Sequence, residues 1–372
     1  MKGRAKAVSD TGRLQKALIV TIGALIAFAC SAGGANLQHA YAADEDLAAG
    51  TAGLETQMVN NVYVNGVDIF DSGSVTCGDG YATYDKTTKT LTLSNAYIDA
   101  DYGFQNIWII GNDNDTVTIK LIGSNVINYC GSGFGTCIVS NPSLVFEGNG
   151  TLDMQSAWTG VSSDSNITIK SGKFSADVGD SGFKCDKMIM KGGKLASVAG
   201  GTYAVQANSM TNDPSQLGHI NGRLPKDAVF KARGNLYKVN SSDGLATLTK
   251  YGSKKEGATV NTIKYGYKYK IDTVGAEAFA NTKVATVTLG KNVKNVKKKA
   301  FYSTTELTKL IIRNYDSSFF DIISLDSKAL TKAGKNSGKN LTVKVKTTKS
   351  VESVRTTLLN AGLSKRAKVK TF

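Results

Sequence analysis

Apolar and polar residues alternate in a motif that returns at a fixed spacing in the middle of the chain. The sequence NITIKSGKF at residues 166–174 recurs 21 residues later as KMIMKGGKL at 187–195. In each copy, apolar residues stand two apart and glycine follows, which is typical of a strand with one face inward and then a tight bend. A period near twenty residues predicts the coils of a solenoid, which bury their apolar faces by stacking on one another.

Two apolar columns define these predicted coils. The first column aligns three sets of residues: Leu144, Phe146 and Leu152; Ile167, Ile169 and Phe174; and Met188, Met190 and Leu195. The second column contains Ile138, Val161, Phe183 and Ala204. Two strands per coil, in register, predict a right-handed parallel β-helix over residues 58–213, with less regular early coils at 90–98 and 116–122.

A different repeat follows a β-rich connecting segment, which we predict at residues 214–257. Each unit of this second repeat combines a strand with an Ala-Phe pair, which we call the plug. The motif VGAEAF at 274–279 matches VKKKAF at 296–301 at an offset of 22 residues. The second half is therefore also predicted to be a stacked array.

The second repeat resembles a known family. The sequence IDTVGAEAF at 271–279, followed by VTLGKNV at 287–293, is similar to the BspA-like leucine-rich repeats of bacterial surface proteins. The resemblance covers residues 258–345, and its third unit has Leu330 at the plug position, as expected of an atypical terminal repeat. Residues 346–372 then form a cap, with a helix from 351 to 361 stopped by Gly362.

The first half carries a second resemblance. The sequences VNGV at 64–67, GDG at 78–80 and ATYDKTTKTLTL at 82–93 resemble the opening of exported carbohydrate-binding-domain β-helix proteins, a family related in fold to pectate lyases. The resemblance runs from about 60 to 210. It implies polysaccharide binding, with calcium in some members, and it names no contact residue.

The N-terminus has the features of an export signal. Basic residues precede an apolar run at 18–30, and Ala40-Tyr41-Ala42 is a small-x-small cleavage site, which predicts a signal peptide over 1–42 that is cleaved near Ala42. A lipid anchor at Cys30 is the alternative, although the preceding residues make a poor lipobox. A flexible segment is predicted at 43–57. No later run approaches the roughly 20 apolar residues of a transmembrane helix, so we expect a secreted or cell-surface protein.

Charge differs between the two halves of the chain. Residues 43–215 have a net charge of −10, and residues 216–372 have +21. The basic half could hold anionic wall polymers, acidic polysaccharide or the acidic half of the chain. The alternative is that its lysines only keep a β-rich surface soluble. Nucleic acid is not expected as a partner, because the chain has an export signal and no known nucleic-acid-binding module.

Four cysteines remain after removal of the predicted signal peptide: Cys77, Cys130, Cys137 and Cys185. An even number in an exported protein permits disulfides. We favour a Cys130–Cys137 pair, because the two residues flank the flexible loop at 131–136. Cys185 lies near the second column and is interpreted as a small buried residue.

Catalytic motifs are scarce. No arginine lies between Arg13 and Arg223, and His219 is the single histidine after the signal peptide, so a lyase or hydrolase has few of its usual groups. No motif requires a cofactor, and we predict a non-catalytic protein. The alternative is an enzyme that uses the carboxylates or lysines of the repeat. These residues are Asp153, Asp177 and Asp180, and Lys170, Lys173, Lys191 and Lys194.

Calcium is the one metal that the residues suggest. Asp113 and Asp115 lie in a short polar turn, and Asp99 and Asp101 lie on what we interpret as an equivalent stretch one coil earlier. Such alternate carboxylates could supply oxygen ligands to Ca²⁺. The alternative is ordinary Asn/Asp turn chemistry.

Exposed aromatic side chains are the candidates for glycan contact. Trp158 lies at a turn between strands, and Tyr102, Phe104 and Tyr129 lie in similar loops. These aromatics could instead pack the corners of the solenoid. Trp108 is interpreted as structural. We therefore predict a non-catalytic glycan-binding or adhesion protein of a bacterial surface, with polysaccharide or cell-wall glycan as partner. A host or bacterial surface protein bound by the basic repeats is the alternative.

Overall fold

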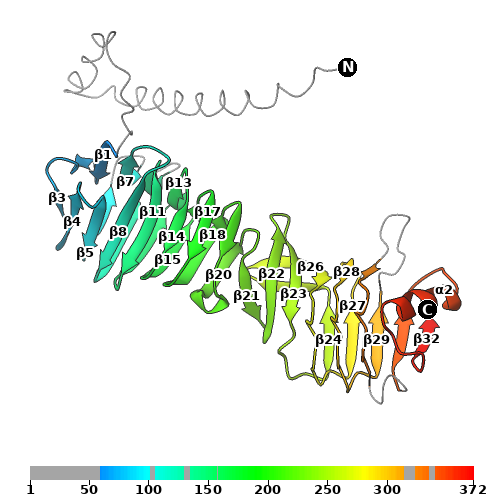
Figure 1. Cartoon of the computed structure of the whole chain (residues 1–372). Coiled ribbons are helices and arrows are strands. Elements are labelled where there is room, and N and C mark those ends of the chain that lie inside the picture. The colour runs from blue at the N-terminus through cyan, green and yellow to red at the C-terminus, as the bar shows by residue number, and fades with distance from the viewer. Residues whose placement is uncertain (1–58, 101–104, 130–134, 157, 314–322, 335–339) are drawn as a thin grey trace, which may run out of the picture. The chain divides into compact units, whose positions relative to one another are not determined.

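The computed structural model describes residues 59–100, 105–129, 135–156, 158–313, 323–334 and 340–372. The chain divides into the units Met1–Thr56 and Gln57–Phe372, and all described residues belong to the second unit. This unit is mainly β and forms a solenoid of about 10 turns (Figure 1). The predicted fold class is confirmed, whereas the predicted signal peptide and the segment 43–57 lie outside the described residues.

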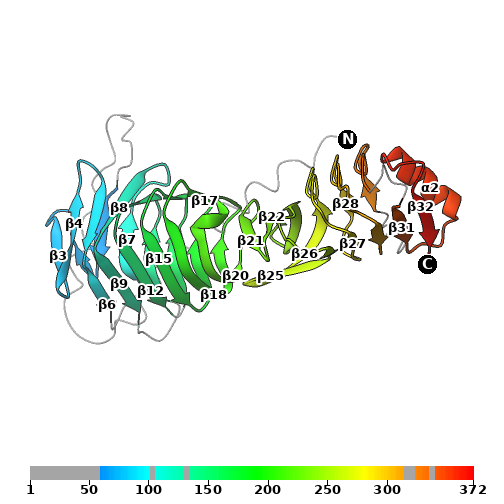
Figure 2. The ribbon, with the colours of Figure 1, turned by 90° about the horizontal axis from the view of Figure 1, so that it is seen from below.

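Each coil of the first half has three strands, not the two predicted. One coil contains β10 (Thr136–Ser140), β11 (Ser143–Gly148) and β12 (Thr151–Ser156). The next contains β13 (Thr159–Ser163) and β14 (Ile167–Ile169), labelled in Figure 1, and β15 (Lys173–Val178), which lies beside β12 in Figure 2. The recurring motif spans two of these strands, because a glycine with positive φ turns the chain between them. The φ values are +103° at Gly148, +93° at Gly172 and +66° at Gly193.

The coils stack into three parallel faces, which we call the first, second and third face. The first face contains β7 (Gln105–Ile110), β10, β13, β16 (Ser181–Lys184) and the end of β18 (Lys194–Gln206). The second contains β5 (Thr90–Ser94), β8 (Thr116–Ile122), β11, β14, β17 (Lys187–Met190) and β19 (Ser209–Thr211). The third contains β6 (Tyr97–Ala100), β9 (Ser124–Tyr129), β12, β15, the start of β18 and β20 (Leu217–Arg223).

The strand registers agree with most of the predicted columns. Phe146 lies beside Ile169, and Phe174 lies beside Leu195. One column shifts by a residue, because Phe183 lies beside Val205 rather than Ala204. The parallel stack also continues past the predicted end at 213, since β20 pairs with β18 as far as Arg223.

Antiparallel strands begin the stack. Strand β1 (Asn61–Val64) pairs with β2 (Val67–Asp68) on one side and with β7 on the other. On the second face, β3 (Ser74–Cys77), β4 (Gly80–Asp85) and β5 are joined in antiparallel order. The first face therefore starts with two strands that do not follow the repeat.

The second half contains two further sheets. One has the order β21 (Val229–Ala232), β22 (Asn235–Ser241), β23 (Leu245–Lys250), β26 (Tyr267–Val274), β28 (Asn295–Val296) and β30 (Ser324–Leu325), with β25 (Thr262–Tyr265) paired to β26. The other has the order β24 (Gly257–Val260), β27 (Thr286–Leu289), β29 (Lys309–Ile312), β31 (Thr342–Val345) and β32 (Lys368–Thr371), all parallel.

The plugs stack inside this second half. The rings of Phe279 and Phe301 are parallel within 5°, with centroids 5.0 Å apart, and Leu330 is buried at the third plug position. Helix α2 (Val351–Asn360) follows, with Ser350 as its N-cap and Gly362 at φ +90° just past its end. The plug pattern and the C-terminal helix are confirmed.

Tyrosines of β25 and β26 join the two halves. The Leu224 backbone N–H donates to Tyr269 Oη at 2.8 Å, and the Tyr265 hydroxyl donates to the Gly218 carbonyl at 3.2 Å. Arg223 packs its guanidinium over the Tyr267 ring, 4.5 Å from the ring centre. Both halves therefore share contacts within one unit.

Candidate functional site

Two aromatic rings lie side by side on the outer surface of the first face. Trp108 of β7 is 40% exposed, and its ring centroid lies 6.0 Å from that of Tyr63 on β1, at an interplanar angle of 34°. The flanking residues Ile107 and Ile109 point inward and are fully buried. Because side chains alternate between the two sides of a strand, this alternation forces Trp108 outward.

The rings belong to a row of outward residues that runs along most of the first face. Register places Asp68, Tyr63, Trp108, Val139, Ser162 and Lys184 on successive neighbouring strands. We call these six residues the platform row. Neighbouring strands lie about 4.8 Å apart, so the row is a straight, rigid line of side chains with the aromatic pair near one end.

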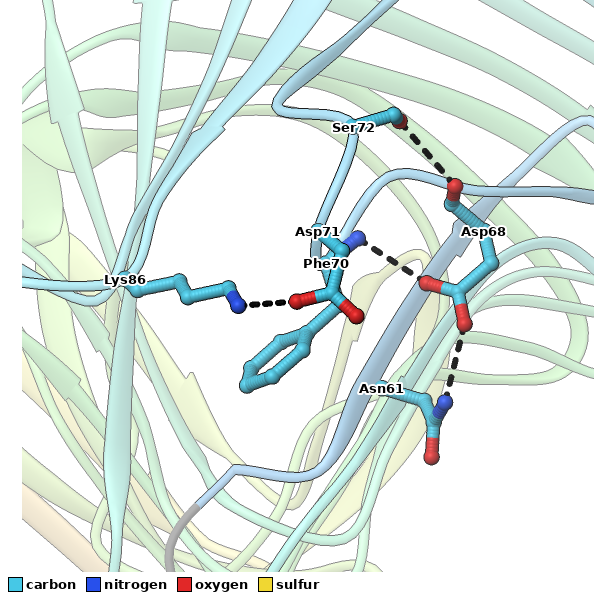
Figure 3. Close-up of polar contacts among 6 residues, drawn as sticks. All are labelled: Asn61, Asp68, Phe70, Asp71, Ser72 and Lys86. Carbon is cyan, nitrogen blue, oxygen red and sulfur yellow. Dashed lines mark hydrogen bonds and ion pairs between the residues drawn. The ribbon is translucent and has the colours of Figure 1, made fainter.

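Polar contacts hold the carboxylate at that end in place (Figure 3). Asp68 Oδ2 accepts a hydrogen bond from Asn61 Nδ2, and Oδ1 accepts one from the Phe70 backbone N–H, both at 2.9 Å. Nearby, Lys86 forms an ion pair with Asp71 and lies over the Phe70 ring, 4.2 Å from its centre. Partial burial raises the pKa of Tyr63, and the charge of Asp68 adds to the effect.

The predicted glycan contacts divide between described and undescribed residues. Trp158 is 40% exposed in the turn between β12 and β13, as predicted, and its carbonyl accepts a hydrogen bond from the Asp180 backbone N–H at 2.7 Å. Tyr102, Phe104 and the side chain of Tyr129 lie outside the described residues. Their part in binding stays a prediction.

Trp108, which the sequence led us to interpret as structural, is partly exposed, and its ring lies beside that of Tyr63. A signal for this was present in the sequence: isoleucines on both sides of the tryptophan already indicate that it faces outward. Tyr63 could not have been assigned in the same way, because its place beside Trp108 depends on the antiparallel pairing of β1.

The three predicted calcium ligands that the structure describes do not lie on equivalent stretches. Asp99 lies beside Asn128 on the third face, whereas Asp113 and Asp115 lie in the turn before β8 of the second face. The idea that these stretches are equivalent is therefore wrong. Asp115 Oδ1 instead forms an ion pair with Lys89 Nζ at 2.6 Å.

Turn chemistry accounts for the segment around Asp113. Asn112 Oδ1 accepts a hydrogen bond from the Asn114 backbone N–H at 3.0 Å, and the Asp113 carbonyl accepts one from Ser165 Oγ at 2.8 Å. Asp101 lies outside the described residues. Among the residues that are described, no group of three or more His, Cys, Asp and Glu side chains is placed to hold a metal ion. Calcium binding thus finds no support there.

The described cysteines are buried thiols. Cys137 is free, its Sγ donates to the Gln155 carbonyl at 3.4 Å, and burial raises its pKa to about 12. Its predicted disulfide partner Cys130 lies outside the described residues, and their pairing stays a prediction. Cys77 and Cys185 are also free and buried, and Cys185 agrees with its interpretation.

The residues considered for catalysis lie on strand surfaces or in the turns between strands. Asp153 and Asp177 are exposed on neighbouring strands of the third face, beside Ser175 and Gln155 respectively. Among the lysines, Lys170 pairs with Glu147 at 3.1 Å, and Lys173 lies beside Lys194. Asp180 Oδ2 accepts from Ser181 Oγ at 2.9 Å, and Lys191 is exposed.

A small cavity in the second half was not predicted. Its volume is about 210 Å³, and its lining includes Arg233, Asn235, Tyr251 and Asn261. Asn235 Oδ1 is already engaged, because it accepts hydrogen bonds from the backbone N–H groups of Gly252 and Ser253 at 3.0 and 3.1 Å. These contacts tie the lining of the cavity to the surrounding turns.

The chain is thus a β-solenoid protein with an exposed aromatic pair on a rigid face. No family model matches it, and no curated protein matches it in sequence. Two solved structures are similar to it at a TM-score of 0.21. The pneumococcal vaccine antigen PcpA is 12% identical, with 80% of this chain and 98% of that one covered. A leucine rich cell surface protein from Faecalibacterium prausnitzii A2-165 is 9% identical, with 78% and 98% covered.

A TM-score of 0.21 is too low to support a conclusion about this chain. Within the part of the chain that the structure describes, no helix has both the length and the apolar character needed to cross a membrane.

Proposed function

We propose that this is an exported, non-catalytic glycan-binding protein of a bacterial surface, and that the platform row carries the binding. The observation behind this proposal is the Tyr63–Trp108 pair, two rings held side by side and partly exposed on rigid strands. The resemblance of residues 60–210 to carbohydrate-binding-domain proteins supports the same function.

The aromatic pair suits a sugar chain for a physical reason. The C–H groups on one face of a pyranose ring are apolar and stack on aromatic rings, while its hydroxyl groups need polar partners. Asp68 lies next to Tyr63 in the platform row, and Ser162 lies two strands beyond Trp108, so these two residues could supply those partners. Since paired strands already hold the side chains, binding orders little that was free before.

An exposed tryptophan is otherwise unfavourable. Leaving a large apolar ring in water forgoes the stabilisation of about 25 cal/mol for each Å² that burial would remove from water. Exposed aromatic patches in soluble proteins commonly mark binding surfaces. The row is open along the face, which suits a polymer better than a small molecule enclosed in a pocket.

A glycan array with the purified chain would identify the ligand, and matched variants would locate the site. Trp108→Ala should weaken binding of the selected glycan about tenfold or more, as expected for loss of about 1.4 kcal/mol of contact free energy. Tyr81→Ala is the control, because Tyr81 is 51% exposed on β4, which belongs to the second-face sheet. Trp158→Ala tests the corner residue separately.

Unchanged binding by Trp108→Ala would remove the platform row from the site. If only Trp158→Ala weakened binding, the corner between the third and first faces would carry the function. An unsaturated product absorbing in the ultraviolet, formed during incubation with uronate polymers, would contradict the non-catalytic part of the proposal.

A further inference from the structure

Lysines are the charged residues on the outer surface of the sheet formed by β24, β27, β29, β31 and β32. Alternation buries Val287, Leu310 and Val343, so the intervening residues of β27, β29 and β31 face outward. The outward residues include four lysines, which we call the basic face: Lys309, Lys344, Lys368 and Lys370. Thr286, Thr288 and Thr342 lie among them in the same rows.

No acidic residue occurs in the five strands of this sheet. Among the described residues, none of the four lysines of the basic face forms an ion pair. Lysines of the neighbouring turns behave differently: Lys297 lies 3.9 Å from an Asp326 oxygen, and Lys299 lies 3.7 Å from a Glu277 oxygen. Among the residues that the structure describes, the basic face therefore has no carboxylate partner.

The arrangement also opposes like charges. Lys344 and Lys370 are direct partners on neighbouring strands, and like charges at such positions destabilise a sheet. Protection of a sheet edge against aggregation explains lysines on the terminal strand β32. It does not explain Lys309 and Lys344, which lie on β29 and β31 in the interior of the sheet.

We propose that the basic face binds an anionic polysaccharide, a chain with a carboxylate on its sugar residues. Outward residues on one strand repeat about every 6.6 Å and neighbouring strands about every 4.8 Å, so the ammonium groups form a two-dimensional array. Carboxylates along a polymer can reach several of these groups at once. The interleaved threonine hydroxyls offer hydrogen bonds to sugar hydroxyls.

The surface is less suited to nucleic acid. Binding of single strands usually combines basic residues with aromatic rings on which bases stack. The outward rows of this sheet contain no aromatic residue, and Ile311 is their large apolar side chain. The basic face is also separate from the platform row. A negative result for one of these two proposed binding sites therefore leaves the other proposal standing.

The test is binding of the full chain to polygalacturonate at low salt, with neutral dextran and a single-stranded DNA oligonucleotide as comparison ligands. The double variant Lys344→Gln/Lys370→Gln should weaken polygalacturonate binding at least about fivefold. The variant Lys297→Gln/Lys299→Gln removes the same net charge from lysines that already have carboxylate partners. It should change binding less than about twofold.

Two further readouts separate binding from folding. Polygalacturonate should raise the melting temperature of the wild-type chain, because it binds the folded state. Lys344→Gln/Lys370→Gln should keep or raise the melting temperature without ligand, since it removes opposed like charges. Trp108→Ala should bind polygalacturonate through the basic face as the wild type does.

Equal weakening by the two double variants would overturn the proposal, since net charge alone would then explain binding. Dextran binding as strong as that of polygalacturonate would also overturn it, and so would tighter binding of the DNA. The absence of any shift in melting temperature at saturating polygalacturonate would do the same.

Discussion

The two halves of the solenoid bury their apolar residues in different ways, and they leave different surfaces exposed. The first half closes each coil with three short strands and glycine corners, and its first face exposes the Tyr63–Trp108 pair. The second half fills its interior with stacked plugs, and its parallel sheet exposes lysines. Since the core positions are used for stacking in both halves, function must lie in the outward positions, which each half can vary separately.

The largest expected effect comes from the cores. Phe174→Ala and Phe301→Ala should each lower the free energy of unfolding by about 3–5 kcal/mol, because both side chains are fully buried and truncation leaves a cavity. Phe174 packs edge-on against Phe146 and Phe183, whereas Phe301 stacks flat on Phe279. Urea denaturation measures the loss.

Double variants then compare the two halves. Phe279→Ala/Phe301→Ala should deviate from additivity, because the two rings touch, whereas Phe174→Ala/Phe301→Ala should be additive within about 0.5 kcal/mol. Strong coupling between Phe174 and Phe301 would mean that energetic effects pass along the hydrophobic core that the two halves share.

A smaller loss is expected at the glycine corners of the first half. Gly148 has φ +103°, and an added Cβ would collide with the Leu121 backbone oxygen. Gly148→Ala should cost at least about 1–3 kcal/mol of stability. Gly73→Ala is the matched control, because Gly73 has φ +77° and open space around it. Equal costs at both positions, measured by urea denaturation, would show that the corner itself is not crowded.

A smaller effect is expected at alkaline pH from buried thiols in the first half, and burial also raises the pKa of Tyr269 in the second half. Burial raises the pKa of the Cys137 and Cys185 thiols to about 12, from an ordinary value of 9.0, and both lie in the first half. The unfolded chain ionises first as the pH rises, so their stability contribution is complete below about pH 9 and falls progressively toward pH 12. Cys137→Ala/Cys185→Ala should remove this part of the pH dependence.

Thiol labelling checks the same residues. In the native, reduced chain at pH 8, Cys77, Cys137 and Cys185 should react slowly, because burial keeps the thiols protonated and covered. Under denaturing, non-reducing conditions, labelling of all four cysteines that follow the predicted signal peptide would contradict the predicted Cys130–Cys137 disulfide. Fast native labelling would contradict the burial.

The repeat made much of this fold predictable. The pairing of Phe146 with Ile169 follows from the 23-residue offset of identical apolar patterns, and the plug residues Phe279 and Phe301 follow from theirs. The number of strands per coil could not be predicted in this way. The spacing of apolar residues around a glycine is the same whether one strand continues through the glycine or two strands meet there. Only the corner geometry at Gly148 separates β11 from β12.

The candidate site was less predictable, for a physical reason. Its two rings come from β1 and β7, which are separated by more than one coil of sequence and meet through antiparallel pairing that interrupts the repeat. The predicted calcium ligands Asp99 and Asp115 show the opposite error, in which the sequence suggested a shared site that the structure does not form. They look similar in sequence, but Asp99 lies on a strand of the third face and Asp115 lies in the turn before β8 of the second face.

The most direct test of the account is the dissociation constant of the array-selected glycan for the wild-type chain, Trp108→Ala and Tyr81→Ala, measured side by side by isothermal titration calorimetry. The account predicts a loss of about tenfold or more for Trp108→Ala and an unchanged constant for Tyr81→Ala, with both variants as stable as the wild type. Equal dissociation constants for Trp108→Ala and the wild type would contradict it.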